Sequence, residues 1–332
     1  MGLTAERGRT VRNLAIVLLK ISVGGLLTWL VLQKVDFSRA FSLIGSFSPL
    51  LAMAVLCLFL VQAFLSAWRW SSVSAAFLNA SLPLSPAFKF FMLSQFYNQA
   101  LPSFIPGDAS RIWGAAPYSD LRRATLAVVL DRVITLVALL LLSGMGLLLL
   151  SAAHRQIPAP VRLALGGLLL AGLAATALVL LFRKRILAGL PAPVRDAFLN
   201  AGRSLQDAGR RTALAGWLGL SVIIHGTNIA IVYCIAAAMH LPLSVMAALT
   251  TVPLVMAAAL LPVTVNGWGV REGAMILLLG QFGLGPTEAA TLSVLYGLFQ
   301  LLFGLAGGLF VLIPTTAPGP GKAVDEGQAS IE

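Results

Sequence analysis

The chain has 332 residues, of which 58% are apolar and only 11% are charged, whereas soluble domains contain about 45–50% apolar and about 25% charged residues. So few charged side chains cannot cover a soluble protein of this length, and the same composition excludes a disordered chain, a coiled coil and a collagen-like chain. Several apolar stretches reach the roughly 18–20 residues that a helix needs to cross a bilayer. The sequence therefore predicts an all-α polytopic membrane protein.

Six uninterrupted apolar stretches predict transmembrane helices, at residues 13–33, 48–68, 124–150, 161–182, 212–239 and 287–313. The first follows an arginine-rich N-terminus, but it is long for a signal peptide and has no A-x-A site, so we interpret it as a retained span. Two further apolar segments, 86–113 and 243–284, are interrupted by Pro and Gly. Residues 192–211 predict an amphipathic helix on the inner leaflet, with binding of anionic headgroups as the alternative role of its arginines. The Pro-, Gly- and Ser-containing residues 315–332 predict a disordered cytoplasmic tail.

The formal net charge of +11 would suggest nucleic acid as a partner in a soluble protein, but the basic residues here cluster in loops. If the N-terminus is cytoplasmic and each interrupted segment returns to the side it entered, almost all loop Lys and Arg are cytoplasmic. The exceptions are Lys34, Arg39, Arg155 and Arg162 outside, and Lys20, Arg132 and Arg271 at membrane depth. This asymmetry predicts two re-entrant hairpins and cytoplasmic N- and C-termini in the cell (inner) membrane.

The two interruptions share the pattern L-P-x-x-x-[PN]-G-x-x-x-R, at residues 101–111 and 261–271, and every matched position is offset by 160 residues. The offset predicts two halves, 12–155 and 161–314, each with three crossings, so that the second half is inverted. Broken helices at matching places in inverted halves are typical of a transporter's binding site. The returning half-helix is expected to begin just after the glycine, at Asp108 or Trp268. The residues that break the helices are Pro102, Pro106, Gly107, Pro262, Asn266 and Gly267.

Charged side chains at membrane depth are costly and usually face a cavity or a partner. In the first half an aspartate precedes an arginine by three residues, in the second an arginine adjoins a glutamate, and an Asp-Arg pair lies inside the third span. One interpretation is that these groups line a cavity and bind a phosphate-bearing headgroup, with a carboxylate exchanging protons. The other is that they pair with each other and lock the hairpins. With a polar residue just before the first break, the candidate substrate-binding residues are Asn98, Asp108, Arg111, Asp131, Arg132, Arg271 and Glu272.

Other polar residues of the spans suggest structural roles. Arg69, between two tryptophans, is interpreted as an anchor at the cytoplasmic end of the second span. His225 and Asn228 predict a hydrogen-bonded helix contact, with a place in the cavity as the alternative. The sequence contains no nucleophile–base set, metal-ligand spacing or nucleotide-binding motif, so we expect neither an enzyme nor a cofactor.

The strings N-Q-A-L-P-S-F-I-P-G-D-A-S-R (residues 98–111), L-D-R (130–132) and L-P-V-T-V-N-G-W-G-V-R-E-G (261–273) resemble the lysylphosphatidylglycerol synthase transmembrane, or flippase-like, family. The family's first motif is closer to L-P-G-x-x-G-G-D-x-x-R, so Ser103 and Pro106 depart from it while Asp108 and Arg111 are kept. The resemblance implies a membrane protein that moves lipids or lipid-linked headgroups between leaflets. Bifunctional relatives carry a soluble aminoacyltransferase domain after the spans. Nothing of that size follows Pro314, so lipid aminoacylation is not expected.

These observations lead to a lipid translocase as the main hypothesis, with an anionic or zwitterionic headgroup entering a cavity between the hairpins. A membrane-embedded enzyme acting on a lipid-linked sugar or phosphate is one alternative. A non-transporting accessory protein that positions lipid-biosynthesis enzymes is another. The expected partners are thus membrane lipids and such an enzyme, and no nucleic acid.

Overall fold

The computed structural model describes residues 22–45, 47–77, 82–101, 105–119, 121–152, 208–260 and 264–314, together with 159, 162–163 and 166–167. Every element that spans these ranges is helical. Most of the predicted span 161–182, most of the predicted amphipathic helix 192–211 and the tail 315–332 lie outside the described residues, as do Pro102 and Pro262.

Within the described ranges, four helices are long and apolar enough to cross a bilayer: α3 (Pro49–Phe77), α6 (Leu121–Ala152), α9 (Ala208–Ala238) and α12 (Pro286–Gly307), which η4 (Gly308–Leu312) extends. They correspond to four of the six predicted spans. Only the second part of the predicted span 13–33 is described, as a short apolar helix at Ser22–Leu32. Helix α3 continues well beyond residue 68 because no Pro or Gly interrupts the sequence before Phe77.

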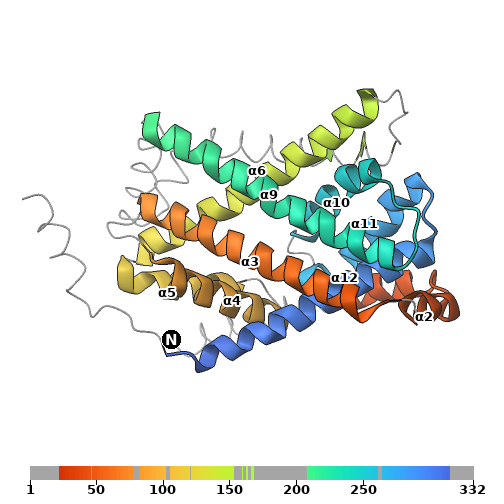
Figure 1. The fold of residues 1–332 in the computed structure, drawn as a ribbon, viewed down its shortest axis with the longest axis horizontal. Coiled ribbons are helices and arrows are strands. Elements are labelled where there is room, and N and C mark those ends of the chain that lie inside the picture. The colour runs from red at the N-terminus through yellow and green to blue at the C-terminus, as the bar shows by residue number, and fades with distance from the viewer. Residues whose placement is uncertain are drawn as a thin grey trace, which may run out of the picture.

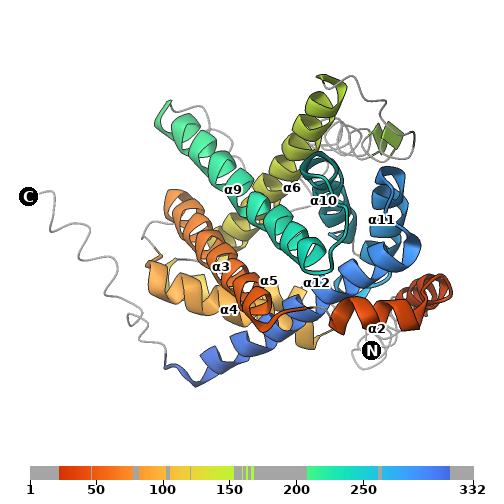
Figure 2. The same ribbon diagram turned by 45° about the vertical axis from the view of Figure 1, so that its right-hand side comes forward.

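Each interrupted segment forms a pair of shorter helices. The first pair is α4 (Leu84–Ala100) and α5 (Ile105–Ala115), followed by η1 (Ala116–Tyr118). The second is α10 (Val245–Ala259) and α11 (Val270–Leu279), separated by η2 (Val265–Gly267) and followed by η3 (Gly280–Phe282). Figures 1 and 2 show the pair α4–α5 at the end of the molecule where α3 ends and α6 begins, and the pair α10–α11 toward the opposite end.

The helix contacts of the first half recur in the second. Helix α4 packs on α12 and α10 packs on α6, while α5 packs on α6 and α11 packs on α12. Helix α3 meets α9 between the two halves. Small residues allow the closest approaches, since a Cβ added to Gly146 of α6 would lie 2.7 Å from the Thr250 Cα of α10. Each short helix pair is therefore held by the last long helix of both halves.

The two breaks differ in local geometry. In the second, Asn266, Gly267 and Gly269 all have positive φ, and α11 begins only at Val270. In the first, α5 already begins at Ile105, so that Pro106 and Gly107 lie in its first turn, where proline fits without losing a helical hydrogen bond. The prediction that the returning helices begin at Asp108 and Trp268 was therefore wrong in both halves.

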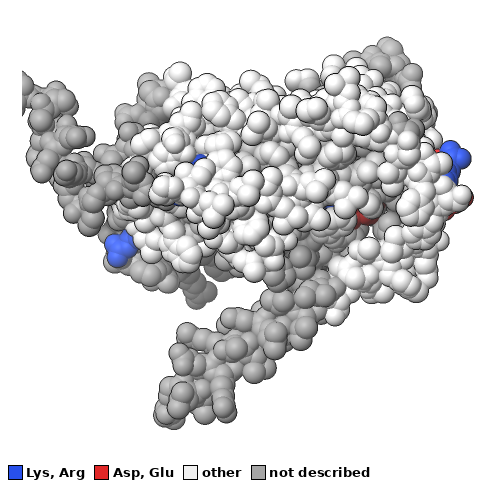
Figure 3. All heavy atoms as spheres, turned by 60° about the horizontal axis from the view of Figure 1, so that its bottom comes forward, with Lys and Arg blue, Asp and Glu red and all other residues white. Residues whose placement is uncertain are grey.

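The surface in Figure 3 is almost free of charge, with Lys, Arg, Asp and Glu visible mainly at the two ends of the molecule. Large apolar side chains cover the exposed faces of α3, α6 and α12, for example Leu50, Leu148 and Leu302. Such a surface suits hydrocarbon rather than water. The short helix α2 (Phe37–Gly45), which the sequence analysis did not predict, exposes Phe37 and Phe41 beside this surface.

Candidate functional site

A cavity of about 200 Å³ lies between the two short helix pairs and is also lined by the long helices α3, α6, α9 and α12. Five of the seven candidate substrate-binding residues line it: Asn98, Arg111, Asp131, Arg132 and Arg271. Asn266 of the second break lines it too, as do His225 and Asn228. Asp108 and Glu272 are not among the lining residues, but each is paired with an arginine that is. The structure thus brings together residues that are far apart in the sequence.

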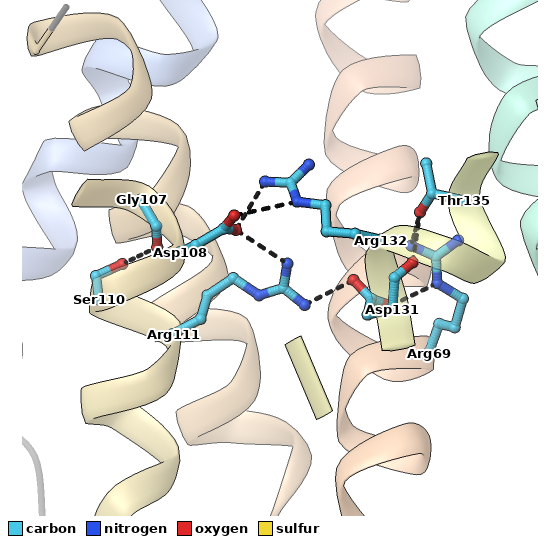
Figure 4. A network of polar contacts seen from close by, with 8 residues as sticks. All are labelled: Arg69, Gly107, Asp108, Ser110, Arg111, Asp131, Arg132 and Thr135. Carbon is cyan, nitrogen blue, oxygen red and sulfur yellow. Dashed lines mark hydrogen bonds and ion pairs between the residues drawn. The ribbon is translucent and has the colours of Figure 1, made fainter. Parts of the chain in front are cut away.

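Asp131 of α6 is shared by two arginines (Figure 4). Its Oδ1 accepts a hydrogen bond from Arg69 Nε at 2.8 Å, and its Oδ2 accepts one from Arg111 Nη2 at 2.7 Å. Arg69 also donates to Ser221 Oγ of α9 at 2.7 Å and to Thr135 Oγ1 at 2.8 Å. Because the side chains of this ion triad are at most 5% exposed, it ties α3, α5, α6 and α9 together away from water.

Asp108 and Arg132 form a more accessible ion pair beside the triad. Arg132 donates to Asp108 through Nη2 at 2.7 Å and through Nε at 3.2 Å. The Arg132 side chain is 37% exposed and the Asp108 side chain 26%, and Arg111 Nη1 lies 3.8 Å from the same carboxylate. Asp108 stands in the first turn of α5, where the helix dipole favours a negative charge. This is the ion pair of the site that a ligand reaches most easily.

Arg111 is enclosed by aromatic rings as well as by carboxylates. Its guanidinium carbon lies 4.7 Å from the centroid of the Trp70 ring and 5.6 Å from that of Phe91. Its Nε is buried and has no hydrogen-bond partner among the described residues. One donor of this arginine is therefore unpaired inside the protein.

Arg271 occupies an equivalent setting in the second half. It donates to Glu272 Oε1 at 2.8 Å, to Ser293 Oγ and Gln300 Oε1 at 3.2 Å, and it stacks over Trp268 at 4.8 Å. The other oxygen of Glu272 accepts the Gly269 N–H and so caps the start of α11. The glutamate both pairs with the arginine and fixes the helix that carries it.

The arginines and carboxylates of the site do not balance. Arg69, Arg111, Arg132 and Arg271 face Asp108, Asp131 and Glu272, which leaves one formal positive charge in excess. The groups pair with each other and line a cavity at the same time, so the two interpretations of the sequence are compatible in this fold. An excess positive charge in a cavity favours a ligand that carries a negative charge.

The profile of the lysylphosphatidylglycerol synthase transmembrane region matches residues 17–308. The chain belongs to this family. The match contains both short helix pairs, the four long helices and every residue of the cavity. It makes the protein a membrane-embedded, multi-pass protein with a role connected to membrane lipids. A search of curated proteins gave no match.

The position predicted for Arg69 from the sequence was wrong, and Arg69 is a residue of the site. Its side chain is buried in the ion triad and is not a cytoplasmic anchor beside Trp68, which is half exposed. The absence of any helix breaker between residue 68 and Phe77 was the available signal, because it places Arg69 inside a helix rather than at its end. Both roles considered for Asn228, a helix contact and a place in the cavity, are observed. It lines the cavity and accepts a hydrogen bond from Tyr296 of α12 at 2.8 Å.

The described residues contain no group of three or more His, Cys, Asp or Glu side chains arranged to hold a metal ion. The lining of the cavity offers arginines, carboxylates, carboxamides, hydroxyls, aromatic rings and the His225 imidazole. These are groups that bind and orient a polar molecule.

Proposed function

We propose that the protein is a lipid translocase that moves a lipid with a polar headgroup between the two leaflets. The observation that carries this proposal is that Arg111 and Arg271 line one cavity. They occupy matching positions of two short helix pairs that lie toward opposite ends of the molecule (Figure 1). A site between such pairs can be reached from one side at a time.

The same proposal includes an inverted repeat of three spans and one re-entrant hairpin per half, six spans in all. It is supported by the 160-residue offset of the two motifs and by the recurring helix contacts, in which α4 on α12 corresponds to α10 on α6. Inverted repeats with broken helices at their interface are the usual construction of transporters in which the halves rock about a central site.

In the proposed mechanism the protein lowers the cost of taking a headgroup through the bilayer. Unpaired polar groups are expensive in hydrocarbon, whereas the cavity supplies charge and hydrogen-bond partners. The acyl chains stay in the lipid. A headgroup anion competes with Asp108 for Arg132, because that ion pair is the most exposed of the site, and the triad behind it holds the helices in place.

We further propose that the protein resides in the cell membrane with both termini in the cytoplasm. Lys89, Arg122 and Arg123 lie near the end of the molecule that holds the loops between α3 and α6, which is then the cytoplasmic end. A cysteine placed in the tail after Pro314 is expected to react with an impermeant thiol reagent only after the membrane is opened.

Exchange of an acyl-labelled phospholipid in proteoliposomes tests the translocase. We expect Arg132→Gln to lower the exchange rate at least about tenfold, because a hydrogen bond between charged groups contributes roughly 1.5–3 kcal/mol. Arg39→Gln is the matched control, since Arg39 forms an exposed ion pair with Glu288 far from the cavity. Exchange that does not depend on Arg132 contradicts the proposal. A lipid recovered in chemically altered form supports a membrane-embedded enzyme instead.

A further inference from the structure

Helix α2 (Phe37–Gly45) carries large apolar side chains that do not line the cavity. The side chains of Phe37, Phe41 and Ile44 are 55%, 71% and 38% exposed. Their spacing of four and three residues places them on one face of the helix. The helix has 9 residues, which at 1.5 Å per residue make about 14 Å, less than half of the ~30 Å that a spanning helix must cross. This apolar face therefore lies at one end of the molecule.

The circumference of α2 is divided into three surfaces. Ala40 is buried, and Leu43 packs partly buried against the main hydrophobic core. The exposed side chains of Arg39 and Ser42 lie on the far side of the helix from Phe41 and its neighbours, at about 100° per residue. One surface thus contacts the protein, one is apolar and exposed, and one is polar and exposed. This division suits a boundary between hydrocarbon and water.

The place of α2 in the fold is consistent with such a boundary. Figure 1 shows it at the end of the molecule opposite the pair α4–α5, and Figure 3 shows charged side chains at that end. The helices that precede and follow α2 expose Trp29 and Leu50, as helices that face lipid do. Tryptophan is enriched at the level of the lipid headgroups. Water and hydrocarbon therefore both lie close to α2.

Two contacts hold α2 against the start of α12. The Asp36 N–H donates a hydrogen bond to Thr287 Oγ1 at 3.1 Å, and Arg39 forms an ion pair with Glu288 at 2.5 Å. The ion pair uses the polar surface of α2, so the phenylalanines point elsewhere. Because the helix is already folded and held by the protein, placing its apolar face in lipid costs little conformational entropy.

We propose that α2 is an interfacial helix that inserts Phe37, Phe41 and Ile44 into the acyl-chain boundary of the leaflet at its end of the molecule. Lipid is the partner because the apolar face lies beside the lipid-facing surface of the flanking helices, while the charged side chain of α2 lies on the opposite face. Through Thr287 and Glu288, the anchored helix fixes the depth at which α12 begins. The proposal concerns contact with the bilayer and holds whether or not the protein exchanges lipids.

A spin label on α2 tests the depth of the helix in phosphatidylcholine vesicles. The full chain, with Cys57 and Cys234 replaced, carries one nitroxide at Phe41→Cys or at Ser42→Cys. We expect the first label to lie about 5–10 Å below the phosphates, open to oxygen and closed to a water-soluble nickel chelate, and the second to be open to the chelate. Chelate access at both positions places α2 in water and overturns the proposal. A label at position 41 that is closed to both reagents indicates a protein partner, such as a second copy, and also overturns it.

Removing the rings tests the anchor itself, with a label at Ile44→Cys as the reporter. Phe37→Ser with Phe41→Ser is expected to raise the water-exposed fraction of this label at least about tenfold, since burial of each phenylalanine favours the apolar medium by more than that factor. Both rings are largely exposed, so the packing of the bundle is kept. Leu148→Ser, at an exposed leucine of α6, is the matched control and should leave the label at its original depth. A label that stays equally deep without the two rings contradicts the proposal.

Discussion

At the scale of single residues, Asp131 is a buried carboxylate that serves as counter-ion to two buried arginines. It is the one carboxylate between Arg69 and Arg111, and the side chains of all three are buried. Removing one member of a buried ion network leaves the others charged in a medium that solvates them poorly. The stability of the helix bundle therefore depends on this residue whatever the site binds.

Asp131→Asn keeps the shape of the side chain and removes its charge. We expect it to lower the free energy of unfolding in detergent by about 3–5 kcal/mol, because two buried guanidinium groups lose their counter-ion. Asp36→Asn is the control: Asp36 is exposed and accepts the Arg39 N–H at the start of α2, a role that asparagine fills equally well. Chemical denaturation of both variants gives the comparison, and similar stability of the two would refute the importance of the triad.

Gly297 of α12 gives a second prediction at this scale. A Cβ there would overlap the Arg271 guanidinium and lie 2.9 Å from the Trp268 ring. We expect Gly297→Ala to displace Arg271 and lower lipid exchange at least about tenfold, since an arginine moved out of place loses its charged hydrogen bonds. Gly226→Ala on α9, where a Cβ meets nothing within 4 Å, should leave exchange unchanged. Equal rates for the two variants would exclude a role for the position of Arg271.

The candidate site was only partly predictable residue by residue. Arg111, Arg271, Asp131 and Arg132 were found because a charge inside an apolar stretch stands out, and the structure brings all four to one cavity. Arg69 was missed because its neighbouring tryptophans also suit a membrane interface. Glutamines such as Gln62 give a weak signal in sequence, since a single carboxamide in a span is compatible with any helix contact.

At the scale of the elements, the break between α10 and α11 depends on backbone conformations that favour glycine. Gly267 has a φ of +74°, and a Cβ on it would lie 2.9 Å from the Ala259 Cβ at the end of α10. Side chains are thus excluded at this point both by strain and by contact. The tight return of the chain uses this residue together with Asn266 and Gly269, which also have positive φ.

Gly267→Ala is therefore expected to destabilise the protein more than Gly283→Ala. Gly283 has a φ of +90° but open space around its Cβ position, so that substitution costs only the strain of roughly 1–2 kcal/mol. The additional contact at Gly267 adds to this cost and disturbs the cavity beside it. Thermal unfolding of both variants in the same detergent measures the difference, and an equal loss would show that contact with Ala259 is unimportant.

Helices were predictable from the sequence where the ends of an apolar stretch coincide with helix-breaking residues. The four long helices were predicted to within a few residues at most ends, whereas α3 extends beyond its predicted end and α2 was not predicted. Hydropathy locates the part of a helix that lies in lipid, but not the part that continues beyond it. The start of each returning helix depends on local φ values that a glycine permits without dictating.

At the scale of the whole molecule, the proposed transport requires one half to move against the other, and so the helix Ser22–Leu32 to shift against the break between α10 and α11. A Cβ on Gly24 would lie 3.5 Å from the Thr264 Cβ across this contact, a separation that a disulfide between introduced cysteines spans. We expect Gly24→Cys with Thr264→Cys, in a chain whose Cys57 and Cys234 have been replaced, to stop exchange when oxidised and to restore it on reduction. Each single cysteine variant should be insensitive to oxidant. Undiminished exchange in the crosslinked protein would exclude sliding at this contact.

Only one part of the arrangement of the two halves was predictable from the sequence, namely which two breaks correspond to each other. The 160-residue offset pairs the two breaks, but nothing in it says which long helix each short pair packs against. That choice follows from close-fitting small residues such as Gly146 and Gly307, whose contacts are visible only in three dimensions.

The contact of α4 with α12 has a consequence for biosynthesis. Helix α4 is synthesised early, whereas α12 is the last long helix of the described residues to be synthesised. The face of α4 that packs on α12 therefore lacks this partner until α12 has been synthesised. Long-range pairing of this kind makes assembly slow. In the meantime, an insertase or the surrounding lipid must cover this face of the nascent chain.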